Sequence, residues 1–408
     1  MKYLITLPAL CVALLLAACY QSAYARGERY PVNAALAGFT VATTVDSPLA
    51  KAILEGTATT GSPRSPSCSD AQALPDPSEF AIISHAHSPD TAMALLIRCL
   101  LQVPDIRYAQ TLFRAEVSRQ LQGDRSHVNN ARRFASGYTV LFVPGWGYQA
   151  NDNETGADLA LPRDRIAALG FETQLVPLLD NGSIEDNARI LADTVRRHLP
   201  SGKRIILASA SSGGPTVAAA LSDEGLHKHA QIRAWINICG VLRGSPVVDT
   251  FTPWPKSLVL RTIALLEGWE YDNLLSLSQA KSRQRFARFE PPPHLTVVNY
   301  IGTPFSGQIS AFGRSFYNLM KSSGPNDGLT TILDALAPGY TVLAQGSDHF
   351  IMEDPDIGLK TEALLPVILQ LIDRDEIHAA FGAGQEASTT TALRSVENPP
   401  TRQAARSW

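Results

Sequence analysis

The sequence of 408 residues lacks the features that mark several large classes of protein. Its net charge is only −3, so no excess of basic residues indicates nucleic acid or an anionic membrane surface as a partner. It shows no glycine-rich dinucleotide fingerprint, no cysteine pairs at zinc-ligand spacing and no internal repeat. Ser201-Gly202-Lys203 lacks the earlier glycine of a phosphate-binding loop. We therefore expect no cofactor and no nucleic-acid partner.

Candidate metal ligands are equally scarce. The histidine pairs His85/His87 and His227/His229 would each present two imidazoles, but neither pair has a third ligand nearby. We expect solvated loop histidines at both places and no metal site.

Long apolar runs are almost missing, apart from Leu4 to Ala18, which Lys2 precedes. This run is too short to span a membrane and suits an export signal. Leu16-Ala17-Ala18-Cys19 resembles the lipobox of bacterial lipoproteins, whereas Ala23-Tyr24-Ala25 fits an ordinary signal peptidase. We predict a signal peptide within residues 1–25 and lipidation at Cys19, with cleavage after Ala25 as the alternative.

We therefore predict an exported protein, namely an outer-membrane or periplasmic lipoprotein of a bacterium. Its lipid alone would hold it to the membrane. The alternative is a secreted protein. Export permits disulfides. The sequence leaves open whether Cys68, in a Pro- and Ser-rich loop, pairs with Cys99 in an apolar helix. Cys239, within AWINICG, is predicted to be a buried free thiol on a strand.

Three regions follow the signal. Residues 26–135 are predicted to form a mostly helical N-terminal extension, irregular up to Ser88 except for a helix at Ser47–Leu54, with further helices after the cap Ser88 and after Pro104. Residues 136–380 are predicted to form an α/β catalytic domain. Residues 381–408 lack apolar periodicity and are expected to be disordered.

Short apolar runs alternate with helical patterns through the catalytic domain. Because such alternation requires parallel pairing through crossovers, we predict a doubly wound, mostly parallel sheet. The predicted strands lie at 139–143, 171–177, 205–208, 232–239, 295–301 and 340–344, and a closing helix lies near 361–372.

One stretch, Arg204 to Leu221, reads RIILASASSGGPTVAAAL. A buried strand breaks into small residues and resumes as an Ala-rich helix, the order that holds a nucleophilic serine in a tight turn. The frames around Ser211 and Ser212 both resemble the G-x-S-x-G motif with its first glycine replaced. The Ser-x-Gly-Gly ending resembles that of many lipases and esterases, and this resemblance favours Ser211. Pro215 favours Ser212, since proline suits the start of a helix. We predict Ser211 as the nucleophile and keep Ser212 as the alternative.

A serine nucleophile needs a base and a group that orients that base. His349, in GSDHF, follows the last predicted strand, and Asp327, in PNDGL, follows the strand before it. Both therefore belong at the carboxyl edge of the sheet, near Ser211. Asp334 and Asp348 compete for the role of the acid.

An insertion at about 243–294 separates two strands and holds Trp254, Trp269 and several leucines. Long inserts at this edge often cover a site, so we interpret it as a helical cap; a helical excursion packed elsewhere fits the same pattern.

From about Tyr138 to Ile372 the chain resembles the α/β-hydrolase family, of the esterase and lipase type. The resemblance is carried by the serine turn, by PGWG at 144–147, by GVLRGSP at 240–246, and by Asn-Asp-Gly and Asp-His-Phe in the order Ser, Asp, His. Pro144 stands where the family has histidine, and Ser209 where it has glycine. The resemblance implies the triad Ser211, Asp327 and His349, with backbone N–H groups of Trp146 and Ser212 as the oxyanion hole.

The predicted function is hydrolysis of a small-molecule carboxylic ester, through an acyl-enzyme and without a cofactor. The apolar side chains of the insertion suggest an apolar acyl group. The alternatives are a non-catalytic cell-envelope binding protein on the same scaffold, or an acyltransferase or amidase that uses the same triad.

Overall fold

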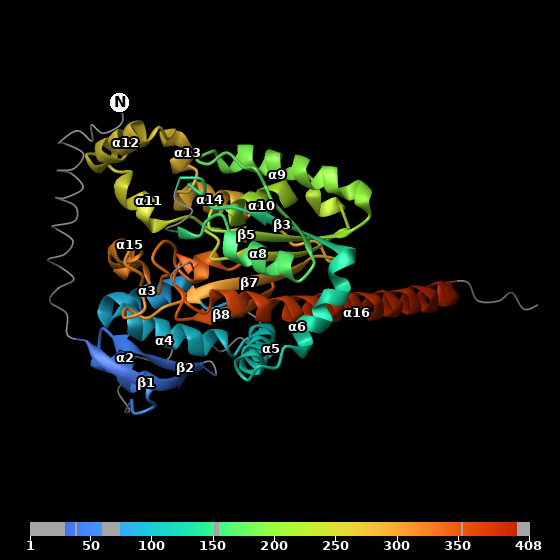
Figure 1. Ribbon diagram of the computed structural model, residues 1–408, viewed down its shortest axis with the longest axis horizontal. Coiled ribbons are helices and arrows are strands. Elements are labelled where there is room, and N and C mark those ends of the chain that lie inside the picture. The colour runs from blue at the N-terminus through green and yellow to red at the C-terminus, as the bar shows by residue number, and fades with distance from the viewer. Residues whose placement is uncertain (1–28, 37–38, 59–73, 151–154, 352–353, 398–408) are drawn as a thin grey trace, which may run out of the picture.

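The computed structural model describes residues 29–36, 39–58, 74–150, 155–351 and 354–397. A six-stranded sheet forms its centre (Figure 1). The strands run in the order β4-β3-β5-β6-β7-β8, and every neighbouring pair is parallel. Their bounds are β3 Tyr138–Val143, β4 Glu172–Leu175, β5 Arg204–Ala210, β6 Ile232–Ile238, β7 Thr296–Thr303 and β8 Tyr340–Gln345.

Each strand lies where the sequence predicted one, and the predicted fold class, α/β with a doubly wound parallel sheet, is confirmed. All six residues of β3 are buried, as are all residues of β5 after Arg204. Helices cover both faces of the sheet, and this explains why these strands read as continuous apolar runs rather than alternating ones.

The two faces carry different helices (Figure 1). One core cluster joins the sheet to α5 (Pro104–Leu121), α8 (Ala160–Ala168) and α16 (Ile357–Glu397). The other joins it to α9 (Ile184–His198), α10 (Gly213–Ser222) and α14 (Gln279–Phe286). The chain leaves β3 toward α8 on the first face and leaves β5 toward α10 on the second. The loops after these adjacent strands therefore diverge and open a crevice at the carboxyl edge, where ligands bind in sheets of this kind.

The N-terminal region contains more regular structure than the sequence indicated. Its helices α2 (Pro48–Leu54), α4 (Pro89–Leu100) and α5 follow the predicted pattern, with Ser47 and Ser88 as N-caps. The stretch up to Ser88, expected to be irregular, also forms an antiparallel hairpin and a further helix: β1 (Tyr30–Leu36), β2 (Phe39–Val45) and α3 (Pro77–Ala86).

The hairpin of β1 and β2 is stabilised by packing against distant parts of the chain. Its buried side chains are Val32, Leu36, Val41 and Val45, and they join one apolar cluster with α4 and with the ends of β7 and β8. A two-stranded hairpin is marginal alone and is stabilised by such packing. The first strand contains Pro31 and Asn33, residue types that are depleted in strands, which weakened its signal in the sequence.

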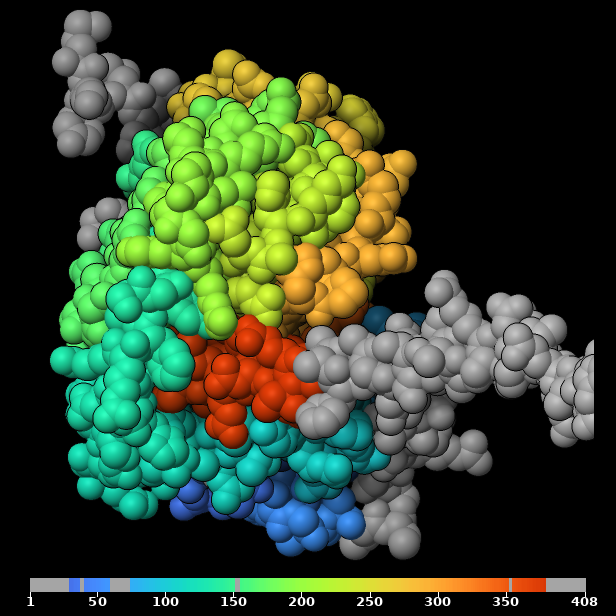
Figure 2. All heavy atoms as spheres, turned by 90° about the vertical axis from the view of Figure 1, so that its right-hand side faces the viewer, coloured from blue at the N-terminus to red at the C-terminus, as the bar shows by residue number. Residues whose placement is uncertain are grey.

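The closing helix α16 begins at Ile357 and ends at Glu397. Residues 381–397, expected to be disordered, thus continue this helix, because adding residues to an existing helix costs far less than starting one. Residues 398–408 of the expected tail lie outside the described residues. Figure 2 shows the packed part of α16 as a red band between the N-terminal helices and the helices of the second face.

The insertion forms α11 (Pro246–Phe251), α12 (Lys256–Glu267), α13 (Tyr271–Leu275) and α14. Figure 1 shows α11, α12 and α13 gathered beyond the carboxyl end of the sheet, whereas α14 packs against α10. Within the described residues, no helix has both the length and the apolar character needed to cross a bilayer.

The cysteines differ in state. Cys239 is buried and free, as predicted, but it follows the end of β6 with a φ of 46° instead of lying on the strand. Cys99 is disulfide-bonded, and Cys68, the partner considered for it, lies outside the described residues. Cys19 and the alternative cleavage site after Ala25 lie outside them as well.

Candidate active site

Ser211 occupies the sharp turn between β5 and α10. Its φ of 50° lies in the left-handed region, which is costly for a residue with a side chain. Three backbone hydrogen bonds hold it there: Ser211 N–H donates to the Ile238 carbonyl at 3.1 Å, and the Ser211 carbonyl accepts from Gly214 at 3.0 Å and Val241 at 3.1 Å. The hydroxyl is thereby fixed above the sheet edge.

The small residues around Ser211 are required by close backbone approaches. A Cβ at Gly213 would lie 2.5 Å from the Val143 carbonyl oxygen, so the start of α10 touches the end of β3. A Cβ at Gly145 would come within 3.1 Å of the Ser211 Cβ. The glycines of the serine turn and of PGWG therefore let β3, β5 and α10 meet at one point.

His349 comes from the loop between β8 and α16 and reaches Ser211. Its Nε2 lies 2.9 Å from the Ser211 Oγ, and its Nδ1 lies 2.8 Å from the Asp327 Oδ2. When Nδ1 carries the ring proton, it donates a hydrogen bond to the carboxylate. The lone pair of Nε2 is then free to accept the serine proton. His349 also donates its backbone N–H to the Asp327 carbonyl at 2.8 Å, which fixes the two loops to each other.

Asp327 is fully buried in the loop between β7 and β8. Its Oδ1 accepts the backbone N–H groups of Leu329 at 2.9 Å and Thr330 at 2.8 Å, which leaves Oδ2 for the imidazole. A carboxylate whose oxygens all face donors is held both in place and in orientation.

The competing residues do not join this row. Asp334 accepts the Thr331 hydroxyl and contacts Arg283. Asp348 accepts the backbone N–H groups of Ser310 and Phe350, both at 2.8 Å. The Ser212 hydroxyl makes no hydrogen bond to any described residue. The structure thus brings together Ser211, His349 and Asp327 and leaves the alternatives apart.

The backbone N–H groups of Trp146 and Ser212 lie beside this row. In PGWG, Gly145 N–H donates to the Ala157 carbonyl at 2.8 Å and Gly147 N–H to the Asp180 carbonyl at 3.0 Å, which fixes the turn on both sides of Trp146. The N–H groups of Trp146 and Ser212 themselves donate to no atom of the described residues. Unpaired N–H groups beside a nucleophile are available to an oxyanion.

Ser211 and His349 open into a cavity of about 290 Å³. The insertion supplies part of its wall, and Trp269 packs edge-on against Trp146 at a centroid distance of 6.2 Å. The side chains that line it are almost all apolar, among them Val247, Val248, Phe251, Leu260, Leu274 and Leu277 from the insertion. At least α11 to α13 therefore border the candidate site rather than pack elsewhere.

Sequence analysis missed one wall of this cavity. Phe312 and Phe316 line it from the segment after β7, and the Phe312 ring lies 4.7 Å from the Phe350 ring, edge to face. Asp348 fastens this segment to the histidine loop through Ser310. Phe312 lies in a turn and Phe316 in the short helix α15 (Arg314–Leu319), and segments this short carry no periodic signal that would have placed these rings here.

Cys239 lies close to the site but does not line its cavity. Burial, and after it the negative charge of Asp327, raise the pKa of the Cys239 thiol, so the thiol stays protonated. Its sulfur accepts the Gly302 N–H at 3.3 Å. Cys239 thus belongs to the packing of β6 against β7.

Of the histidines expected to be solvated loop residues, His85, His87 and His227 are exposed and His229 is half-buried. His85 lies in α3 rather than in a loop. Among the described residues, no three side chains of His, Cys, Asp or Glu are arranged to hold a metal ion.

No model of a protein family matches the chain, and no curated protein is similar to it in sequence. Solved structures do resemble it. A metagenomic carboxyl esterase is 23% identical over 59% of this chain and 76% of its own, with a TM-score of 0.48. A Bacillus licheniformis lipase in its mature form is 22% identical over 57% of this chain and 91% of its own, with a TM-score of 0.42. A monoacylglycerol lipase from Paleococcus ferrophilus is 15% identical over 59% of this chain and 95% of its own, with a TM-score of 0.34.

Proposed function

We propose that the protein is a serine hydrolase that cleaves carboxylic esters. One observation carries the proposal: the unbroken row from the Ser211 Oγ to His349 at 2.9 Å and from His349 to Asp327 at 2.8 Å. A serine hydroxyl is a weak nucleophile until an oriented base takes its proton, and this row supplies that base. The apolar wall of the cavity favours an ester with a hydrocarbon acyl group.

The reaction proceeds in two halves. The Ser211 Oγ attacks the ester carbonyl carbon while His349 Nε2 takes the serine proton, and the N–H groups of Trp146 and Ser212 stabilise the resulting oxyanion. The C–O bond to the alcohol then breaks, the alcohol leaves with the proton from Nε2, and an acyl-serine remains.

In the second half, water gives a proton to Nε2 and its oxygen attacks the acyl carbon. The bond to Ser211 breaks, and Ser211 recovers its proton as the carboxylic acid leaves. Asp327 keeps the imidazole in the required tautomer and orientation throughout.

A fluorophosphonate probe tests this proposal directly. We expect it to label the native protein on the peptide that contains Ser211, as identified by mass spectrometry. Ser211→Ala should abolish labelling and lower ester turnover by about three to six powers of ten. The matched control is Ser212→Ala, one residue along, which should still be labelled. Labelling of Ser212, or absence of labelling and of ester turnover in the native protein, contradicts the proposal.

We also propose that the protein is exported and lipidated at Cys19. The disulfide at Cys99 supports export, since structural disulfides form mainly in oxidising compartments. Mass spectrometry of the mature N-terminus tests this: a diacylated Cys19 is expected, and replacement by Ala should remove the lipid. A mature chain that starts at Arg26 would contradict lipidation and support ordinary secretion.

A further inference from the structure

The chain between β7 and the loop of Asp327 forms one wall of the cavity at the nucleophile. Its residues 304–323, which we call the wall segment, contain turns, the short helix α15 and a single 3-10 turn. Phe312 and Phe316 line the cavity, and Phe312 is 41% exposed, so its ring reaches the mouth of the cavity. With so little regular structure of its own, the wall segment depends for its position on what packs behind it.

The N-terminal hairpin and α4 hold the first end of the wall segment. Phe305 is fully buried in the apolar cluster that the hairpin, α3 and α4 share. Asp90 in α4 accepts both the backbone N–H of Ser306, at 2.8 Å, and its hydroxyl, at 2.6 Å. The Gly307 N–H donates to the Thr44 carbonyl of β2 at 3.1 Å, and a Cβ at Gly307 would lie 2.5 Å from that carbonyl oxygen. The two backbones thus meet with no side chain between them.

The same aspartate reaches the helix that carries Phe316. The hydroxyl of Tyr317, the next residue, donates to Asp90 at 3.2 Å, and both residues are almost completely buried. Beyond α15, the Ser84 hydroxyl of α3 donates to the Lys321 carbonyl at 2.6 Å. Hydrogen bonds from the hairpin, α3 and α4 therefore hold the wall segment on both sides of its two rings.

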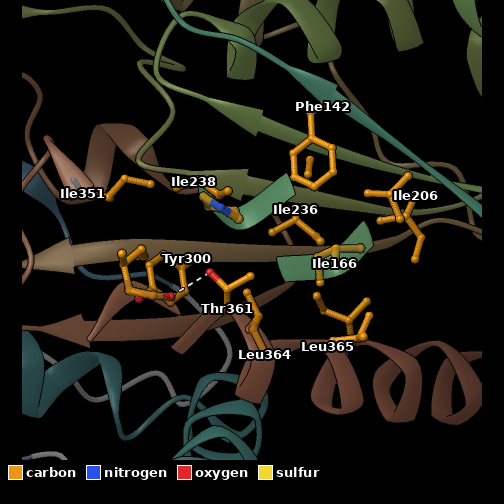
Figure 3. Close-up of a pocket in the computed structure, with 15 residues that line it drawn as sticks. Phe142, Ile166, Ile206, Ile236, Ile238, Tyr300, Ile351, Thr361, Leu364 and Leu365 are labelled. Carbon is orange, nitrogen blue, oxygen red and sulfur yellow. Dashed lines mark hydrogen bonds between the residues drawn. The ribbon is translucent and has the colours of Figure 1, made fainter. Parts of the chain in front are cut away.

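The triad itself is held by other parts of the chain. Ser211 donates its backbone N–H to the Ile238 carbonyl, and His349 donates its own to the Asp327 carbonyl. Ile351, two residues after His349, belongs to the same apolar cluster as Ile238, and both line the small cavity between the sheet and α16 (Figure 3). None of these contacts comes from the hairpin, α3 or α4. Loosening the wall segment should therefore leave the triad in place.

We propose that Asp90 is a positioning residue: through Ser306 and Tyr317 it holds the two aromatic rings of the wall segment against the bound ester. Asp90 acts only through this segment and touches no substrate. It therefore affects how tightly the ester is bound, whereas attack by the serine proceeds as before. This inference rests on the proposed ester hydrolysis and gives the N-terminal region a part in it.

Tyr317→Phe tests the link, because it removes the hydroxyl that reaches Asp90 and keeps the ring. Tyr340→Phe is the matched control: it also removes a hydroxyl that donates to a carboxylate, that of Asp375 at 2.6 Å, but at the start of β8, at the opposite edge of the sheet. We expect Tyr317→Phe to raise KM for p-nitrophenyl butyrate about three- to tenfold and to leave kcat within about twofold of the native value. Ser306→Ala, which removes the other hydroxyl bonded to Asp90, should act in the same direction. Tyr340→Phe should change neither constant.

A double-mutant cycle shows whether the effect passes through the wall. A protein with Phe312→Ala and Phe316→Ala lacks both rings and should itself have a raised KM. Adding Tyr317→Phe to it should change KM by less than about twofold, because the rings that Tyr317 positions are already gone. Independent effects that multiply, a loss in kcat instead of KM, or an unchanged KM in Tyr317→Phe would each overturn the inference.

Hydrogen exchange reports on the wall segment apart from turnover. In Tyr317→Phe the amides of residues 304–323 should exchange at least about threefold faster than in the native protein, whereas in Tyr340→Phe they should keep their native rates. If the native protein cleaves no ester and takes no fluorophosphonate, the proposed function fails, yet this comparison still decides whether Asp90 holds the wall segment. Unchanged exchange in Tyr317→Phe refutes the link even in an active esterase.

Discussion

The sheet edge and the N-terminal region each bury an aspartate completely, and the two aspartates have opposite surroundings. Asp327 at the sheet edge accepts hydrogen bonds from two backbone N–H groups and lies against the His349 imidazole. Asp90, in the first turn of α4, also accepts hydrogen bonds, but a second carboxyl, that of Asp46, lies beside it. Two equally buried carboxyl groups thus serve different ends.

Asp90 joins regions that are distant in the sequence. It accepts the backbone N–H of Asp46 at 2.7 Å, the backbone N–H of Ser306 at 2.8 Å, the Ser306 hydroxyl at 2.6 Å and the Tyr317 hydroxyl at 3.2 Å. Ser306 and Tyr317 flank the cavity-lining residue Phe312 in sequence. Asp90 therefore links the N-terminal region to the segment that walls the candidate site.

The difference lies in the neighbouring charge. Burial, and after it the negative charge of Asp46, raise the pKa of Asp90 to about 7. Burial likewise raises the pKa of Asp46. A buried carboxyl group beside another carboxyl group holds its proton to a higher pH, whereas one that lies against an imidazole N–H can orient a base.

The largest expected effect comes from the aspartate at the sheet edge. Asp327→Asn should lower kcat/KM for an ester by about 10⁴-fold, because an amide no longer selects the imidazole tautomer that leaves Nε2 free. Its free energy of unfolding should change by only about 1 kcal/mol, since the residue keeps its shape and an oxygen for Leu329 and Thr330. Steady-state kinetics and urea unfolding measure the two effects. An active Asp327→Asn protein would remove the contrast between the two aspartates.

A smaller, pH-dependent effect is expected from the other aspartate. Since the pKa of Asp90 is higher in the folded protein than in the unfolded chain, the folded state binds the extra proton. The contribution of Asp90 to stability is complete below about pH 4 and is lost as the pH rises through about 7. Asp90→Asn cannot ionise, so the free energy of unfolding of the native protein relative to this variant should fall by up to about 1.4 kcal/mol per pH unit in that window.

Urea unfolding of both proteins between pH 5 and 8 makes this measurement. Asp46→Asn is the control: without the neighbouring charge, the loss of stability should shift to lower pH and become shallower. Parallel stability curves for the native protein and Asp90→Asn would show that folding does not raise the pKa of Asp90, and would contradict this prediction.

The contrast also shows what a pattern of residues can reveal. Asp327 belongs to Asn-Asp-Gly after a predicted strand, so its position at the sheet edge follows from the strand order. Asp90 stands in Ser-Pro-Asp at the start of a helix, where an acidic residue usually only complements the helix dipole. Its actual partners Ser306 and Tyr317 lie more than two hundred positions away, and no local pattern announces them.

By itself, the sequence determined the six strands, the helices between them and the tight turn at Ser211, because apolar periodicity and small residues act over a few neighbouring positions. Only the tertiary structure decided the N-terminal hairpin, the aromatic wall from Phe312 and the partners of Asp90. Each of these depends on which distant surfaces pack together and on how completely their side chains fill the space between them, and both are properties of the assembled core rather than of any single segment.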